Sequence, residues 1–223
     1  MTEFMDKYWM LAAMTTLAYA LGSIPFGLVL AKTFCGIDPR QDGSKNVGAT
    51  NVARLCGKKW GFATLVCDLG KGALVIGLGF LALRLYPQTP AYLPALAGLA
   101  VIMGHMFSFF LRFKGGKGVA TTVGVFLALT PAPFMIAVVI CLLVIWRSGY
   151  VSAGSIALVV TLPPLACFFG YRPEFALSLA VCVLVLVAHR ENIARLLKGQ
   201  EKPWNVKKEK DAEKDRGDMG NRG

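Results

Sequence analysis

Long stretches without a charged residue constrain this chain most. Residues 132–146, for example, read APFMIAVVICLLVIW. About 20 apolar residues in a helix cross a hydrocarbon core of about 30 Å, and many of these stretches approach that length. A soluble helical bundle of this size would show a polar face on its helices, and these stretches have none. Composition agrees, because 55% of the residues are hydrophobic and 17% are charged, against about 25% charged in soluble domains. The sequence predicts an all-α, polytopic membrane protein.

Seven segments are expected to cross the membrane. In chain order they are residues 8–31, 62–86, 91–111, 119–130, 132–146, 151–169 and 175–197. The fourth and fifth are short and meet at Thr130-Pro131-Ala132-Pro133. Because a Pro-x-Pro pair breaks a helix, we expect a tight turn there, with a single kinked span or a re-entrant hairpin as alternatives. Residues 1–197 thus form a membrane domain, and the charged residues 198–223 are expected to be a disordered tail.

The positive charges predict the orientation of these segments. Lys and Arg collect in alternate connections, namely those of residues 32–61, 112–118 and 147–150, and in the tail. The other side carries only Lys7, Arg84 and Arg172. Since cytoplasmic loops accumulate Lys and Arg, the N-terminus is expected outside and the C-terminus in the cytoplasm.

Three polar segments fall on the cytoplasmic side under this topology. They read GSKNVGATNVAR at 43–54, GHMFSFFLRFKGGKGVATT at 104–122, and HRENIARL at 189–196. Each combines groups that suit a phosphate. We therefore expect an anion site at the cytoplasmic membrane surface.

The second segment contains a glycine loop. Gly115, Gly116 and Gly118 surround Lys117 just ahead of the fourth span. Glycines let backbone amides approach a ligand and form an anion-binding nest, and a helix N-terminus adds partial positive charge. The loop is not a Walker A motif, because Leu111 stands where its first glycine belongs and Gly118 replaces the Ser or Thr. The loop predicts phosphate binding without implying ATP.

The first segment offers neutral hydrogen-bonding groups in Ser44, Asn46, Thr50 and Asn51 and a guanidinium in Arg54. Arginine suits phosphate because it can bind two oxygens at once. In a helix Thr50 and Arg54 would share a face. The alternative is a capped interfacial helix with a basic face.

The third segment places His189 and Asn192 on one helical face together with Leu196. Arg195 lies off that face and is expected to reach lipid headgroups. A histidine at a span end can also be a simple interfacial residue. Within the second span, Asp68 and Lys71 are expected to neutralise each other.

Several familiar catalytic patterns are missing. The fifth residue after His105 is Phe110 and the fifth after His189 is Ala194, so there is no H-x-x-x-x-D dyad. The sequence shows neither an acidic cluster for catalytic magnesium nor a G-x-S-x-G motif. We therefore expect an already activated donor, and catalysis by positioning and charge neutralisation.

Taken together and in this order, the three segments resemble the signatures of the bacterial acyl-phosphate:glycerol-3-phosphate acyltransferases. The resemblance extends to the DPR at 38–40 and to the seven-span layout, and so covers the chain up to the tail. The family usually has Gly where this chain has Lys45. The resemblance implies transfer of an acyl group from acyl phosphate to the sn-1 hydroxyl of glycerol 3-phosphate, giving lysophosphatidic acid and phosphate. It also implies a site on the cytoplasmic face of the bacterial inner membrane.

The resemblance further implies roles for individual residues. Arg54 and Lys117 would grip the acceptor phosphate, and His189 and Asn192 would line the acceptor pocket. The donor phosphoryl group would rest among Ser44, Asn46, Gly116 and Ser155, with Ser152 as the alternative serine. The family's route is direct attack without an acyl-enzyme, with His189 as a candidate base or orienter.

The expected partners are acyl phosphate, glycerol 3-phosphate and membrane lipid. We expect no cofactor, no metal and no nucleic acid, and the oligomeric state stays open with a monomer slightly favoured. Two other functions would suit parts of the sequence. A transporter of a phosphorylated anion would also use helix termini and basic residues, and a transferase acting on a lipid carrier would need a carboxylate–metal site.

Overall fold

The structure is a computed structural model that describes residues 2–204, with side chains from residue 8 onward. Every regular element in that range is helical, which confirms the predicted all-α class. The elements are α1 (Thr2–Ser23), α2 (Phe26–Cys35), α3 (Ala49–Cys56), α4 (Lys58–Leu85), α5 (Leu93–Met106), a 3-10 turn η1 (Phe109–Leu111), α6 (Val119–Leu129), α7 (Pro131–Ser148), α8 (Val151–Phe168), α9 (Arg172–Ala188) and α10 (Arg190–Leu197).

The number of helices that can span a membrane is smaller than seven by length and composition. Five stretches qualify: Tyr8–Cys35, Lys58–Leu85, Leu93–Leu111, Pro131–Ser148 and Val151–Phe168. The bent pair α9 and α10 makes a sixth if it is counted as one span. The predicted fourth span corresponds to α6, whose 11 residues extend about 16 Å.

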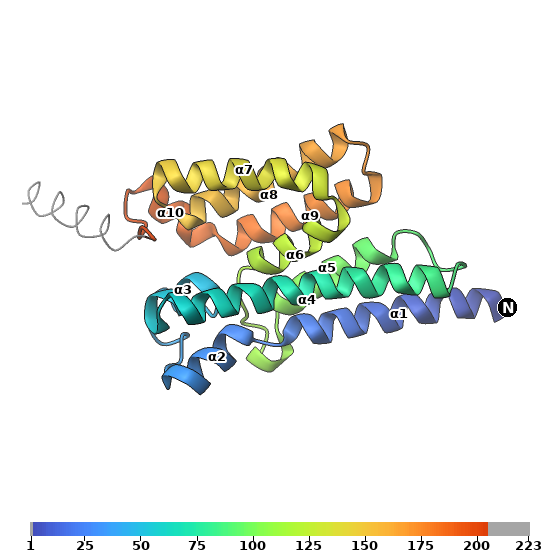
Figure 1. Ribbon diagram of the computed structural model, residues 1–223, viewed down its shortest axis with the longest axis horizontal. Coiled ribbons are helices and arrows are strands. Elements are labelled where there is room, and N and C mark those ends of the chain that lie inside the picture. The colour runs from blue at the N-terminus through green and yellow to red at the C-terminus, as the bar shows by residue number, and fades with distance from the viewer. Residues whose placement is uncertain (1, 205–223) are drawn as a thin grey trace, which may run out of the picture.

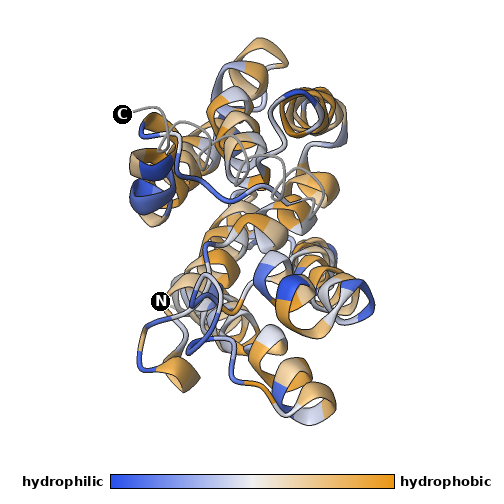
Figure 2. Ribbon diagram, turned by 90° about the vertical axis from the view of Figure 1, so that its left-hand side faces the viewer, coloured by the Kyte–Doolittle hydropathy of each residue, from blue (hydrophilic) through white to orange (hydrophobic). Residues whose placement is uncertain are grey.

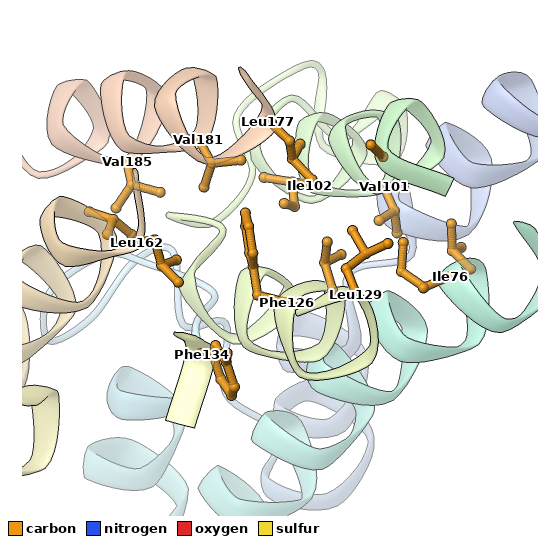
Figure 3. Close-up of a cluster of buried hydrophobic side chains, with 14 of the residues drawn as sticks. Ile76, Val101, Ile102, Phe126, Leu129, Phe134, Leu162, Leu177, Val181 and Val185 are labelled. Atoms are coloured by element: carbon orange, nitrogen blue, oxygen red, sulfur yellow. The ribbon is translucent and has the colours of Figure 1, made fainter. Parts of the chain in front are cut away.

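Helix α6 packs mostly against other helices. Phe126 and Leu129 lie in the main hydrophobic cluster together with Ile102 from α5, Leu162 from α8 and Val181 from α9 (Figure 3). The backbones of α4 and α6 also approach closely, since a Cβ on Gly72 would lie 2.5 Å from the Thr121 carbonyl oxygen. Small residues allow such contacts between membrane helices. An apolar helix in this position need not reach both bilayer surfaces.

The predicted break between the fourth and fifth segments is confirmed. Helix α6 ends at Leu129 and α7 begins at Pro131, so the two are separate helices. Proline suits the first position of a helix, because its missing N–H would have no partner there.

The predicted first span is interrupted within the stretch GSIPFG. Helix α1 ends at Ser23 and α2 begins after Pro25. A Cβ on Gly22 would lie 2.2 Å from the Val101 carbonyl oxygen, and one on Gly104 would lie 2.3 Å from that of Tyr19. The stretch is therefore a close packing surface between α1 and α5 that ends in a break.

The predicted seventh span is bent, and the folded chain continues beyond residue 197. Helices α9 and α10 meet at His189 with a bend of 62°. Beyond α10 the chain returns to the helices: Glu201 is only 7% exposed, and the Trp204 N–H donates to the Gly149 carbonyl. The start of the predicted tail therefore belongs to the folded body, and residues 205–223 lie outside the described residues.

The polar segments gather at one end of the molecule. In Figure 1, α3 and α10 lie at the end of the long axis opposite the N-terminus. Figure 2 views that end, where hydrophilic ribbon lies in front of predominantly hydrophobic helices.

Candidate active site

A cavity of about 400 Å³ lies where the polar segments meet. Its wall is formed by the loop before α3, α3 itself, the start of α6, the start of α8 and the region from His189 to Trp204. Ten residues expected at a site line it: Ser44, Asn46, Thr50, Asn51, Arg54, Lys117, Gly118, Ser155, His189 and Asn192. The three polar segments, far apart in sequence, thus share one cavity.

A hydrogen-bonded chain joins the second and third segments. The Lys117 ammonium donates to the Asn192 amide oxygen, and the Asn192 amide nitrogen donates to the Glu201 carboxylate. The same carboxylate accepts from Ser152 Oγ at 2.8 Å and from Arg195 Nε at 2.7 Å. Glu201 therefore organises α8, α10 and the glycine loop around the cavity.

Sequence reasoning missed Glu201 and misplaced Arg195. Arg195 does not extend toward lipid headgroups, because it pairs with Glu201 and lines the cavity. Gly199 has φ +64°, a left-handed conformation that turns the chain after α10. A glycine just past a helix end predicts that the helix stops there, but it does not predict where the chain goes next.

The charges in this network are shifted by burial and by their neighbours. Burial lowers the pKa of Lys117 and outweighs the attraction of Glu201. Burial alone would raise the pKa of Glu201, but hydrogen bonds from Asn192, Ser152 and Arg195 outweigh it and hold that pKa below its ordinary value. Lys117 is thus a poorly hydrated cation that a bound anion would stabilise.

Asn51 shapes the first polar loop. It is 2% exposed, and its amide oxygen accepts the Ser44 N–H at 2.9 Å. Its amide nitrogen donates to the carbonyls of Pro39, Asp42 and Asn46. These contacts use the polar groups of Asn51 within the loop, so the structure favours a scaffold role over the expected role as a ligand.

Helix α3 presents Thr50 and Arg54 to the cavity. Both residues are exposed, and Arg54 has no ion-pair partner among the described residues. In the loop before this helix, Lys45 has φ +55°, a left-handed conformation that favours glycine.

The glycine loop works differently from the predicted nest. The Gly115 N–H donates to the Met106 carbonyl and the Gly116 N–H to the His105 carbonyl, both at 3.0 Å. These two amides are therefore engaged, and neither glycine lines the cavity. Gly118, with φ +82°, is instead the N-cap of α6, which begins at Val119. The first amides of a helix lack intrahelical partners, so those at the start of α6 are the amides available to an anion.

His189 is 3% exposed at the junction of α9 and α10, and its Nδ1 lies 2.8 Å from the Val185 carbonyl oxygen. Because a carbonyl only accepts, Nδ1 carries the proton, and in the neutral ring Nε2 is left as an acceptor. On α8, Ser155 Oγ donates to the Val151 carbonyl at 2.9 Å and lines the cavity.

A buried ion pair stands behind the cavity. Lys71 Nζ lies 2.9 Å from Asp68 Oδ1, which confirms the expected pairing within the second span. His105 Nδ1 lies 3.4 Å from the same oxygen, and Asp68 and His105 both line the cavity. Among residues 8–204, whose side chains are described, no three His, Cys, Asp or Glu residues are grouped to hold a metal ion.

The sequence and structure are similar to known proteins over most of the chain. The sequence profile of the glycerol-3-phosphate acyltransferase family matches residues 12–199. Proteins named glycerol-3-phosphate acyltransferase are 54% identical over 190 residues in Nitratidesulfovibrio vulgaris and 52% identical over 196 residues in Desulfovibrio desulfuricans. These alignments cover 85% and 88% of this chain. They cover 57% of the first relative's length and 86% of the second's.

A solved structure is also similar. The crystal structure of PlsY (YgiH), an integral membrane glycerol 3-phosphate acyltransferase, in its glycerol 3-phosphate form, has a TM-score of 0.81 and 36% sequence identity. The match covers 89% of this chain and 97% of that one. Its lysophosphatidic acid form matches with a TM-score of 0.77.

Proposed function

The chain belongs to the glycerol-3-phosphate acyltransferase family, and from this premise we propose how its cavity performs the reaction. The enzyme moves an acyl group from acyl phosphate to the sn-1 hydroxyl of glycerol 3-phosphate and yields lysophosphatidic acid and phosphate. The observation that carries the proposal is that Arg54, Lys117 and His189 line one cavity at the polar end of an apolar helical body.

Arg54 and Lys117 bind the phosphate of glycerol 3-phosphate. Arg54 is a cation without an ion-pair partner in the described part of the chain. The bound phosphate gives the Lys117 ammonium a counter-charge, which offsets the cost of burying that ammonium. The amides of the first turn of α6 lie at the same wall, because Val119 and Ala120 line the cavity. His189 and Asn192 line the acceptor side and orient the glycerol hydroxyls.

The donor phosphoryl group rests against Ser44 and Asn46 on one side and Ser155 on the other, all of which line the cavity. Its acyl chain lies in the lipid beside the helices. Gly115 and Gly116 serve this arrangement through the position of their loop, since their amides are bonded to the end of α5.

The reaction is a direct displacement. The sn-1 oxygen forms a bond to the acyl carbon, the bond from that carbon to the phosphate oxygen breaks, and phosphate leaves with the bonding pair. The hydroxyl proton passes to His189 Nε2 or to a phosphate oxygen of a substrate. Because the donor is an activated anhydride, the residues act by positioning and by neutralising charge.

The cavity faces the cytoplasm of a bacterial cell, in the inner membrane. Two observations support this orientation. The N-terminus lies at the opposite end from α10 (Figure 1), as an odd number of crossings requires. The Lys- and Arg-rich connections border the cavity end, in keeping with their preference for the cytoplasm. In this arrangement α6 is the fourth of seven crossing elements, although it is shorter than the others. The monomer is the working unit.

The structural and family findings favour this reaction over transport of a phosphorylated anion. The cavity that contains the basic residues lies at one end of the molecule, whereas a transport path needs sites near the bilayer midplane.

Purified protein in detergent tests the proposal directly. Acyl phosphate and labelled glycerol 3-phosphate, without metal or nucleotide, should give labelled lysophosphatidic acid. We expect Arg54→Ala and Lys117→Met to lower kcat/KM at least 100-fold, because the loss of a charged group that holds a phosphate costs about 3 kcal/mol or more. Lys58→Ala and Lys114→Met remove exposed lysines nearby and serve as matched controls with near-normal turnover. Equal activity with acyl-CoA, or normal kinetics of the Arg54 and Lys117 variants, would contradict the proposal.

A further inference from the structure

His105 lies in the last turn of α5, where α4, the glycine loop and the cavity meet. Its side chain is 7% exposed and contacts Asp68 through Nδ1, while its carbonyl accepts the Gly116 N–H. We infer that His105 is a positioning residue that sets where the Lys117 ammonium stands in the cavity. The inference rests on the proposed function, in which Lys117 binds the acceptor phosphate.

The imidazole is held from behind by a buried set of charges. Asp68, 2% exposed, pairs with Lys71 at 2.9 Å. Lys71 Nζ also donates to the carbonyl oxygens of Gly22 at 2.9 Å and Ile24 at 3.2 Å, at the break between α1 and α2. Because Lys71 is held by these backbone carbonyls as well as by Asp68, the Asp68 carboxylate has a fixed place. The imidazole lies against this carboxylate, with its Nδ1 3.4 Å from Asp68 Oδ1.

The front edge of the same ring supports the glycine loop. A Cβ on Gly116 would lie 2.2 Å from His105 Nε2, and a Cβ on Gly115 would lie 2.1 Å from the His105 carbonyl oxygen. Neither glycine has a positive φ, so close approach to His105, rather than backbone strain, explains the need for glycine at both positions.

Lys117 follows directly in the chain. Its ammonium reaches the Asn192 amide across the cavity, and a shift of the Gly116 backbone moves the start of that side chain by a similar distance. A displacement of about 1 Å in a positioned group can cost about 100-fold in rate. The path from Asp68 through His105 and Gly116 to Lys117 thus links the buried ion pair to the acceptor phosphate.

A double-mutant cycle between His105 and Gly116 tests this path. In the wild-type background, Gly116→Ala should raise KM for glycerol 3-phosphate about tenfold or more, because the methyl group displaces the loop from the ring. His105→Asn keeps an amide near the Nδ1 position for Asp68 but removes the ring's front edge. It should raise the same KM several-fold. In the His105→Asn background the added methyl finds room, and we expect its effect to shrink about tenfold, a coupling common between contacting residues.

The expected pattern is specific to one substrate. KM for glycerol 3-phosphate should change in each variant, while KM for acyl phosphate stays within about twofold, which a merely structural role would not produce. The inference is overturned if the two substitutions act independently in the cycle, or if both KM values rise together. If His105→Asn does not purify as a folded protein, His105→Gln replaces it, because glutamine reaches the front edge but loses the contact with Asp68. An unchanged KM for glycerol 3-phosphate in the His105→Gln variant also overturns the inference. A wild-type protein that makes no lysophosphatidic acid would instead refute the proposed function.

Discussion

Replacing Glu201 by Ala should both destabilise the protein and disturb its site. The carboxylate accepts hydrogen bonds from Ser152 at 2.8 Å, from Asn192, and from Arg195 at 2.7 Å. Hydrogen bonds to charged groups contribute about 1.5–3 kcal/mol each, so losing the two bonds from Ser152 and Asn192 should lower the free energy of unfolding by about 3–6 kcal/mol. The Arg195 side chain is 37% exposed, and its pair adds at most about 1 kcal/mol.

The same change removes the partner that orients Asn192, and Asn192 in turn holds Lys117. We therefore expect KM for glycerol 3-phosphate to rise about tenfold or more, together with a clear fall in the unfolding midpoint. Chemical unfolding in detergent and steady-state kinetics measure the two effects. Glu191→Ala is the matched control, because that carboxylate is 76% exposed and lies 3.9 Å from Arg195. It should change the free energy of unfolding by about 0.5 kcal/mol or less. A Glu201 variant that matched this control in stability and in KM would refute the reasoning.

Three further predictions concern stability. Gly72→Ala should lower the free energy of unfolding by about 1–3 kcal/mol, because its methyl would meet the Thr121 carbonyl oxygen at 2.5 Å, as overpacking does. A Cβ on Gly70, in the same helix, would meet open space, so Gly70→Ala should raise the free energy of unfolding by about 0.5–1 kcal/mol. If chemical unfolding showed equal effects for the Gly72 and Gly70 variants, the close packing of α4 on α6 would be contradicted. Lys45→Gly should raise the unfolding midpoint slightly and leave kcat unchanged, because a backbone φ of +55° costs a non-glycine residue about 1 kcal/mol. A clear loss of stability in this variant would argue against the left-handed conformation at residue 45. Since the pKa of Glu201 is held below its ordinary value, its stabilisation is full above about pH 4.3 and is lost as the pH falls through the lowered pKa. The stability difference between wild type and Glu201→Ala should therefore shrink in acid, and a difference that grew instead would contradict the sign.

Local patterns predicted the helices well where the chain itself carries the signal. Pro131 marks the start of α7 at the predicted break, because proline cannot continue the hydrogen bonding of a preceding helix. The break at Pro25 between α1 and α2 was not predicted. Hydropathy did not separate α6 from the membrane-crossing helices. An apolar side chain gains similarly from lipid and from a protein interior, and Phe126 is therefore no different in sequence from a lipid-facing residue.

The roles of single polar residues were harder to predict. Asn192 and His189 were placed on one face from helical periodicity, and both line the cavity. Arg195 was assigned to the lipid surface because the sequence contains no sign that Glu201 returns to meet it. That return depends on a turn at Gly199 and on Ser152 in another helix.

The sequence by itself determined the membrane-embedded helical class, the order of the polar segments and the chemistry of a phosphate site, because these depend on residue type and local spacing. Only the tertiary structure decided which polar atoms remain free for a ligand. The amides of Gly115 and Gly116 and the side chain of Asn51 are satisfied within the protein, whereas Arg54 faces the cavity without an ion-pair partner among the side chains of residues 8–204. Hydrogen bonds between segments distant in the chain make that difference, and local sequence does not encode them.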